Sequence, residues 1–283
     1  GNFVFGSNTA AGVNPGTMPN PNITWEKSTK YDLGLESLFW NGLLGAEVTL
    51  FKERRTDILA RRNLSIPETF GFPSLPDENI GEVKNQGFEI VLTHRKSFAD
   101  FSYNISGNIS YAKNKIIFMD ETPNVEEYQN QTGHPVGSSL YYQADGIFNT
   151  QEELDSYPHH KSSQVGDPKI IDLNEDGVID SNDRFRFDYT STPRTVFGIN
   201  IGLTYKGFDL SALIQGQTGA YNYDGDFVTL GKSDLSNTFV ARAKDRWTVD
   251  NPNGTMPRAD CYQPGSSTIF LYDATFVRLK TVE

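Results

Sequence analysis

The sequence of 283 residues predicts an all-β protein whose antiparallel strands form part of a transmembrane β-barrel with long extracellular loops. Three observations support this fold class. Strand-like segments alternate between apolar and polar residues, very short and very long connections follow one another strictly, and aromatic residues gather beside the short connections. A membrane barrel has turns on one side and loops on the other, whereas a soluble sandwich keeps most of its connections short.

The connections divide the chain into pairs of strands. The short ones are residues 40–42, 96–100 and 206–207, and the long loops run over about 55–84, 114–194 and 217–267. A further strand-like run at residues 276–280 brings the expected total to about seven strands. Because the sequence ends inside that run, we expect a fragment boundary there.

The first strands show the alternation in a less strict form. In residues 31–39 the apolar positions are Tyr31, Leu33, Leu35 and Phe39, and Asp32, Gly34 and Glu36 stand between them. Residues 44–50 and 88–93 again place an apolar side chain at every second position. A period of two predicts strands with one apolar and one polar face.

The later strands follow the rule closely. Residues 101–111 carry aromatic and aliphatic side chains, and Gly107, at odd positions, with serine and asparagine at even positions. Residues 195–205 and their hairpin partner, residues 208–215, alternate in the same way. Each run has roughly the ten residues that a tilted strand needs to cross a bilayer.

Aromatic pairs flank the three short connections: Phe39 and Trp40, Phe98 and Phe101, and Tyr205 and Phe208. In a barrel these rings would lie at one membrane interface, where amphipathic rings are favoured. Ordinary packing of aromatic pairs in hairpins is the alternative. Serine, asparagine, glycine and acidic residues on the polar faces suit a hydrated or plugged lumen, and a soluble sandwich remains the competing fold.

The composition excludes several classes of protein. The formal net charge of −11 leaves no basic stripe for a nucleic acid, and no apolar stretch is long enough for a helical membrane span. The single cysteine, Cys261, has no disulfide partner, so a loop or buried thiol is expected. No hydrolase elbow, zinc-protease helix, phosphate loop or dinucleotide motif occurs, so we expect no enzyme.

One loop motif predicts a structural calcium ion. Residues 172–183 place oxygen donors at positions 1, 3, 5, 9 and 12 of a calcium-loop pattern, with Gly177 at position 6 for the sharp turn. The expected ligands are Asp172, Asn174, Asp176, Val178 through its carbonyl oxygen, Asp180 and Asp183. Asp183 replaces the usual glutamate, and its shorter side chain would weaken bidentate binding. A solvated acidic turn is the alternative.

Other loop residues allow two interpretations. Tyr141, Tyr142 and Tyr223 could stack on sugar rings, or they could pack the loops against one another. A capping box at residues 150–153 predicts a short helix, and residues 235–247 could form a longer amphipathic helix.

Motifs spread along nearly the whole chain resemble, in family order, those of SusC/RagA-type TonB-dependent outer-membrane transporters. They are residues 20–26 (NPNITWE), 31–36 (YDLGLE), 81–89 (GEVKNQGFE), 166–168 (GDP) before the acidic loop, 192–194 (TPR), 245–247 (DRW), 251–253 with 257–258, and 272–280 (YDATFVRLK). Together these motifs are far more specific than any one of them.

The resemblance implies a roughly 22-stranded barrel with an internal plug, of which residues 1–283 would be a C-terminal part without the plug domain and the final strands. It also implies import of oligosaccharides, or of peptides, across the cell outer membrane of a bacterium of the Bacteroidota group. The implied partners are a SusD-like surface lipoprotein, the TonB complex through an N-terminal region that is missing here, and outer-membrane lipid. The alternative function is that of a soluble, secreted carbohydrate-binding β-sandwich with a structural calcium, and a glycan-degrading enzyme ranks third.

Overall fold

The computed structural model describes residues 2–6, 8–11, 19–62, 75–121, 126–224, 240–262 and 265–283. The chain divides into two compact units, and the long strands contribute to both. Unit 1 comprises Gly1–Leu33, Leu50–Gly87 and Lys113–Val136, and unit 2 comprises Gly34–Thr49, Phe88–Ala112 and Gly137–Glu283.

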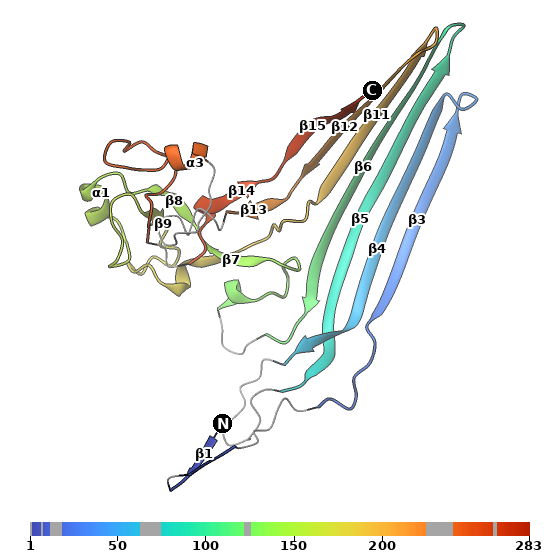
Figure 1. The fold of residues 1–283 in the computed structure, drawn as a ribbon. Coiled ribbons are helices and arrows are strands. Elements are labelled where there is room, and N and C mark those ends of the chain that lie inside the picture. Colours follow the sequence, from blue (N-terminus) through green and yellow to red (C-terminus); the bar gives the residue numbers. More distant parts are fainter. Residues whose placement is uncertain are drawn as a thin grey trace. The chain divides into compact units, whose positions relative to one another are not determined.

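Seven long strands form one sheet, and their order confirms the predicted pairing (Figure 1). They are β3 (Lys27–Phe39), β4 (Leu44–Arg61), β5 (Asp77–Ser97), β6 (Phe101–Phe118), β11 (Thr195–Tyr205), β12 (Phe208–Thr218) and β15 (Phe276–Val282). The order β15-β12-β11-β6-β5-β4-β3 places each long strand beside its neighbours in sequence. The pairs of β11 with β6, β11 with β12 and β12 with β15 are antiparallel.

Four of these strands extend beyond the predicted boundaries, so the loop limits given above need correction. β4 ends at Arg61 and β5 begins at Asp77, so residues 55–61 and 77–84 of the expected loop 55–84 belong to strands. β6 continues to Phe118 rather than ending near residue 113, and β12 continues to Thr218. The added residues mix charged and apolar side chains without strict alternation, and backbone ladder bonds do not require an alternating pattern. The alternation between apolar and polar residues therefore covers only part of each strand, and the boundaries predicted from it were too short.

The tightest hairpins are built from residues with positive φ. Lys206 and Gly207 have φ values of 47° and 86°, and they connect Tyr205 to its directly paired partner Phe208. Two consecutive positive φ angles define a type I′ turn, whose twist matches that of antiparallel strands. Asparagine and glycine likewise supply positive φ at Asn41 and Gly42.

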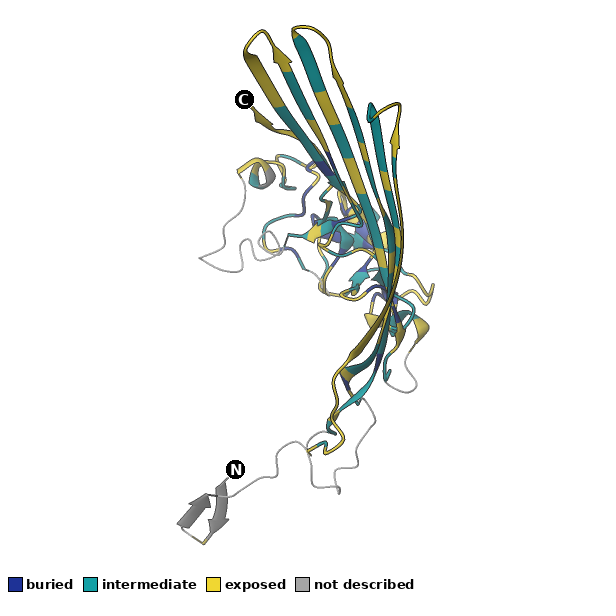
Figure 2. Cartoon of the chain, turned by 90° about the vertical axis from the view of Figure 1, so that its right-hand side faces the viewer, coloured by how far each residue is buried: buried dark blue, intermediate teal, exposed yellow. Residues whose placement is uncertain are grey.

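Large apolar side chains of the long strands are exposed, and Figure 2 shows these strands as mostly intermediate or exposed. Leu33, Leu35 and Phe208 are 71%, 66% and 79% exposed. Among the described residues, Ala60 and Ile116 are the buried hydrophobic residues that the seven long strands supply, and all the others lie in the connections. A sandwich would bury its apolar faces in a dry interior, so the sandwich alternative is wrong.

The long connections contain secondary structure of their own. In unit 2, β7 (Ser139–Tyr142) pairs with β10 (Arg184–Phe187), β8 (Ala144–Ile147) with β9 (Pro168–Ile170), and β13 (Tyr221–Tyr223) with β14 (Leu271–Asp273). The helices within the described residues are α1 (Gln151–Ser156), α3 (Val240–Lys244), and the one-turn segments η2 (Glu127–Gln129), η3 (Ser181–Asp183) and η4 (Thr268–Phe270). A separate hairpin pairs β1 (Asn2–Phe5) with β2 (Asn8–Ala11).

We call residues 139–187, 221–223, 245–262 and 265–273 the loop assembly. Two buried clusters hold it together, one of Met256, Cys261 and Phe270 and the other of Tyr142, Ile170 and Ile179. The first cluster comes from the third long connection and the second cluster from the second. Hydrogen bonds join the two connections: the N–H of Tyr142 donates to the carbonyl oxygen of Ser266 at 2.9 Å, and the N–H of Ala144 donates to the Thr268 hydroxyl at 3.0 Å.

The predicted helix at the capping box is confirmed. Thr150 caps α1, and its hydroxyl accepts a hydrogen bond from the backbone N–H of Glu153 at 3.1 Å. The expected helix at residues 235–247 is represented by the shorter α3, and residues 235–239 lie outside the described residues.

Candidate functional site

An aromatic cluster of five rings lies on the loop assembly and the segment that follows β10. We define it as Tyr141, Phe187, Tyr189, Tyr221 and Tyr223. Tyr141 contacts Phe187 and Tyr223 with ring centroids 5.9 and 5.8 Å apart. Phe187 contacts Tyr221 at 5.0 Å, and Tyr221 contacts Tyr189 at 5.1 Å. The rings are partly exposed, with Tyr189 the most open at 37%.

Strand geometry explains which rings join this aromatic cluster. Tyr141 and Phe185 are paired across β7 and β10, and Phe187 is paired with Ser139. Successive residues of a strand face opposite sides, so Tyr141 joins the aromatic cluster while its neighbour Tyr142 turns away. The sequence analysis missed Phe187 and Tyr189, although the spacing Phe185, Phe187, Tyr189 repeats every second residue and would have indicated one aromatic face.

Tyr142 lies in the loop core. Its side chain is 5% exposed and packs with Ile170 and Ile179, and burial raises the pKa of its phenol. The structure therefore favours loop packing over substrate contact for Tyr142.

Tyr141 and Tyr223 have intermediate positions. Burial also raises the pKa of both phenols, and for Tyr223 a hydrogen bond with the Ser266 side chain opposes that rise. The Tyr223 ring also meets Phe270 edge-on at 6.2 Å, which anchors the aromatic cluster to the buried core. Their contact with substrate remains a prediction.

A cation borders the aromatic cluster. The guanidinium of Arg194 lies over the Tyr189 ring, 3.9 Å from its centroid, and donates a hydrogen bond to the carbonyl oxygen of Asp188. An aromatic surface can stack on flat or ring-shaped ligands. The guanidinium beside it can donate hydrogen bonds to a ligand but cannot accept them. Sugars and peptides both offer acceptors for such a donor.

The acidic loop 172–183 satisfies most of its carboxylates internally. Asp172 Oδ2 accepts from the N–H of Gly177 at 2.7 Å, and Asp176 Oδ1 accepts from the N–H of Val178 at 2.9 Å. Asn174 Oδ1 accepts from the N–H of Asp176 at 3.3 Å. Gly177 has φ +83° and supplies the sharp turn that the motif predicts.

Asp183 and Asp180 anchor the end of this loop. Asp183 is fully buried, and its two oxygens accept from the N–H groups of Leu173 and Asp180 at 2.9 and 2.7 Å. Burial raises the pKa of the Asp183 carboxyl, against the opposing effect of these bonds. Asp180 caps η3 by accepting from the N–H of Asn182 at 2.7 Å.

The predicted calcium ligands differ in whether their oxygens are free of hydrogen bonds and so available to an ion. The Oδ1 atom of Asp172 is buried without a hydrogen-bond partner, whereas both oxygens of Asp183 are in use. Within the part of the chain that the structure describes, no group of three or more histidine, cysteine, aspartate or glutamate side chains converges for a metal. Binding would therefore require the carboxylates of this loop to exchange backbone partners for the ion.

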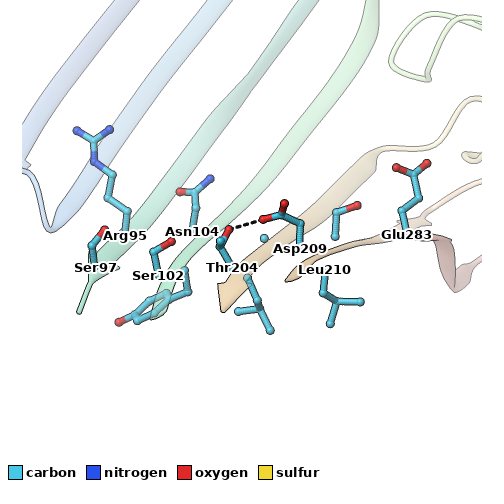
Figure 3. A pocket seen from close by; sticks show the side chains of 12 residues that line it. Arg95, Ser97, Ser102, Asn104, Thr204, Asp209, Leu210 and Glu283 are labelled. Carbon is cyan, nitrogen blue, oxygen red and sulfur yellow. Dashed lines mark hydrogen bonds between the residues drawn. The ribbon is translucent and has the colours of Figure 1, made fainter. Parts of the chain in front are cut away.

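A hollow of about 510 Å³ with both polar and apolar lining residues lies near the short turns of unit 2 (Figure 3). Arg95, Asn104 and Glu283 project from one face of the sheet, and Leu210 projects from the other. The hydroxyl of Thr204 donates to Asp209 Oδ1 at 2.7 Å across the β11–β12 hairpin. This side of the sheet offers hydrogen-bonding groups to water or to another polar surface.

Comparison with known proteins agrees with the strand arrangement. A family model described as TonB dependent receptor-like, beta-barrel matches residues 2–269. The TonB-dependent receptor P26 of Formosa agariphila is 30% identical over 96% of this chain and 28% of its own length. The TonB-dependent receptor SusC of Bacteroides thetaiotaomicron is 25% identical over 93% of this chain and 26% of its own length.

A solved structure shows the same fold. The structure of the RagAB peptide transporter superposes with a TM-score of 0.69 at 21% identity, covering 99% of this chain and 31% of that chain. The chain thus spans less than a third of the length of the proteins it matches. None of the helices in the described ranges is long and apolar enough to cross a membrane.

Proposed function

The chain belongs to the TonB-dependent receptor-like β-barrel family, and from this premise we propose that it forms barrel wall and loops of an outer-membrane importer of the SusC/RagA type. The importer takes up oligosaccharides or peptides, and passage breaks no covalent bond. The outer membrane is that of a bacterium related to Bacteroidota, as the organisms of its relatives suggest.

One observation carries this proposal: the sheet has an exposed apolar face and a polar opposite face. On β11, Ile199 and Leu203 alternate with Asn200 and Thr204. Ile199 is 38% exposed although it is apolar. In a membrane, hydrocarbon tails would cover such a face. In water, a second layer of protein would have to cover it. The polar face would line a lumen that holds water or a plug.

We assign substrate contact to the aromatic cluster on the loop assembly, principally to Tyr141 and Tyr223. Rings that are already packed against one another lose little conformational freedom on binding, which favours ligand stacking. A SusD-like lipoprotein would close over the loops, and the TonB complex would supply energy through the plug region of the whole protein. The RagAB structure is titled as that of a peptide transporter, so both substrate classes enter the test.

We further propose that Asp172, Asn174 and Asp176 bind a structural Ca²⁺, with the Val178 carbonyl and Asp180 completing the set. The orphan Oδ1 of Asp172 and the positive φ of Gly177 support this assignment. Asp183 would hold the loop from beneath through its two carboxylate oxygens, which accept hydrogen bonds from the backbone N–H groups of Leu173 and Asp180.

Uptake by cells tests the transport proposal. The whole receptor gene would be deleted and then restored with the native gene or with Tyr141→Ala and Tyr223→Ala together. Cells would receive mixed glycan or mixed peptide as the sole carbon source. Growth that depends on the native gene for one of the two supports import, and growth that never depends on it contradicts the proposal. Outer-membrane fractionation of each variant controls for its expression.

A further inference from the structure

The apolar face of the long strands continues, along each strand, directly into basic residues. On β4, Leu50 is followed on the same face by Lys52 and Arg54, since every second residue of a strand points the same way. Leu50 is 50% exposed, and Lys52 and Arg54 are exposed as well. The apolar character of this face therefore ends at a cationic edge.

The neighbouring strands extend this edge. Glu82 of β5 receives two hydrogen bonds from Arg54, at 2.7 and 3.0 Å, so the two side chains share a face. Lys84 follows Glu82 by two residues and shares that face too. On β6, Tyr111 is followed at the same spacing by Lys113 and Lys115.

Tyr111 belongs to the apolar face, because its ring stacks on that of Phe88 at 5.6 Å. Phe88 lies an even number of positions from Lys84 and Glu82 along β5, so all three lie on the same face of the strand. We call Lys52, Arg54, Lys84, Lys113 and Lys115 the basic edge.

Most of the basic edge lacks acidic partners. Arg54 is paired with Glu82, but Lys52, Lys84, Lys113 and Lys115 form no ion pair among the described residues of the chain. The opposite face of the same unit is different. There Glu53 accepts from Arg55 at 2.8 Å and from the Ser28 hydroxyl at 2.7 Å, and Lys30 lies 3.9 Å from the same carboxylate.

This contrast has a direct electrostatic meaning. In a chain with net charge −11, four lysines without counterions on one face are not expected from composition. Their position next to an apolar surface matches that of lipid headgroups beside acyl chains, where each basic residue adds to attraction for anionic lipid. The opposite face, with its paired charges, would meet water.

We propose that the basic edge binds the phosphate groups of outer-leaflet lipid and so holds the barrel wall at a fixed depth. The inference rests on the proposed function, because it requires the apolar face to contact lipid. It concerns a lipid site that is separate from the aromatic cluster and the substrate.

The test uses the full-length receptor in detergent and measures its affinity for diphosphorylated lipid A by native mass spectrometry. The variant carries Lys52→Gln, Lys84→Gln, Lys113→Gln and Lys115→Gln. A charge-matched control carries Lys30→Gln, Lys96→Gln, Lys161→Gln and Lys206→Gln, which lie off the basic edge. We expect at least about tenfold weaker binding by the variant, and less than about threefold for the control.

Further arms separate lipid from other anions. Lipid A stripped of its phosphates should bind the native receptor about tenfold more weakly, and added salt should weaken binding of the phosphorylated form. Equal affinity for both lipids, or equal loss in variant and control, overturns the proposal. The proposal is also overturned if inorganic phosphate binds saturably and displaces bound lipid A as effectively as unlabelled lipid A does. If the variant with four substitutions does not fold, the double variant Lys113→Gln with Lys115→Gln replaces it. Its affinity for lipid A and the salt dependence of that affinity then test the proposal.

Uptake is measured separately. A receptor that binds lipid A through the basic edge but imports nothing contradicts the transport function alone. A receptor that imports substrate without preferring phosphorylated lipid contradicts the lipid site alone.

Discussion

The guanidinium Nε of Arg258 lies 2.6 Å from Oδ1 of Asp167, which is fully buried and 91 residues away in sequence. Asp167 also accepts from the backbone N–H of Gln164 at 2.8 Å and from that of Tyr262 at 3.1 Å. The N–H of Arg258 in turn donates to the carbonyl oxygen of Gly166 at 2.9 Å. One carboxylate thus joins the second long connection to the third.

Removing the cation should release this junction. Arg258→Met leaves the Asp167 carboxylate buried without its charge partner, and such changes typically destabilise by about 3 kcal/mol or more. We expect faster hydrogen exchange in residues 148–170 and 245–262 and an unchanged sheet. Lys161→Met, an exposed change in the same connection, is the control. Identical exchange in the two variants would mean that the ion pair does not hold the connections together.

Gly216 in β12 should tolerate no side chain. It is paired directly with Phe197, whose ring occupies the space that a Cβ atom would take. Gly216→Ala should lower stability by about 1–3 kcal/mol through overpacking, measured as the temperature at which the barrel loses its heat-resistant gel mobility. At Gly107 the nearest atom would be a backbone oxygen 4.0 Å away, so Gly107→Ala is the control. Phe197→Leu should partly rescue Gly216→Ala.

Alanine substitutions of Tyr141 and Tyr142 should have different effects, the first on substrate binding and the second on the stability of the loop assembly. Tyr142→Ala empties part of the cluster with Ile170 and Ile179 and should destabilise the loop assembly by about 3 kcal/mol. Tyr141→Ala should weaken substrate binding while the loop assembly stays folded. Calorimetric binding and proteolysis of both variants provide the measurement. Equal proteolytic sensitivity, or full substrate affinity in Tyr141→Ala, would contradict this division.

The stability of the segment around α1 should depend on pH. Glu153 accepts from the N–H of Asn149 at 2.9 Å and from Lys169 Nζ at 3.0 Å, and these bonds lower the pKa of its carboxyl below the usual 4.5. A lowered pKa in the folded state contributes stability above about pH 4.5, and that contribution is lost as the pH falls through the folded value.

Hydrogen exchange of residues 149–156 measured between about pH 6 and pH 3 should therefore show added opening on the acid side. Glu153→Gln should remove this added dependence. An acid-side opening of the same size in Glu153→Gln would assign the effect to other groups.

Calcium should stabilise the acidic loop. Asp172→Asn replaces the carboxylate whose Oδ1 lacks a partner, and Asp155→Asn in α1 changes an exposed carboxylate outside the loop. We expect the native receptor and Asp155→Asn to bind Ca²⁺ in calorimetric titrations and Asp172→Asn to bind at least about tenfold more weakly. Affinity should fall with acidification, since burial raises the pKa of Asp183. Full affinity in Asp172→Asn would rule out this site.

The loops show where reasoning from sequence stopped. The acidic motif, the Thr150 cap and the loop tyrosines were recognisable because each depends on neighbours a few residues away. The pair of Asp167 and Arg258 was not recognisable, because nothing in either local segment specifies a partner at such a separation. The same holds for Phe187 and Tyr223, which both contact Tyr141 from different connections.

The sequence by itself determined the strand pairing, the two faces of the sheet and the family, because alternation and turn chemistry are local properties. Only the tertiary structure decided that β4, β5 and β6 continue beyond their alternating runs, and that Tyr142 is buried while Tyr141 is partly exposed. The physical reason is that backbone ladders and long-range packing depend on what lies on the neighbouring strand or loop. That neighbour is tens of residues away in the chain.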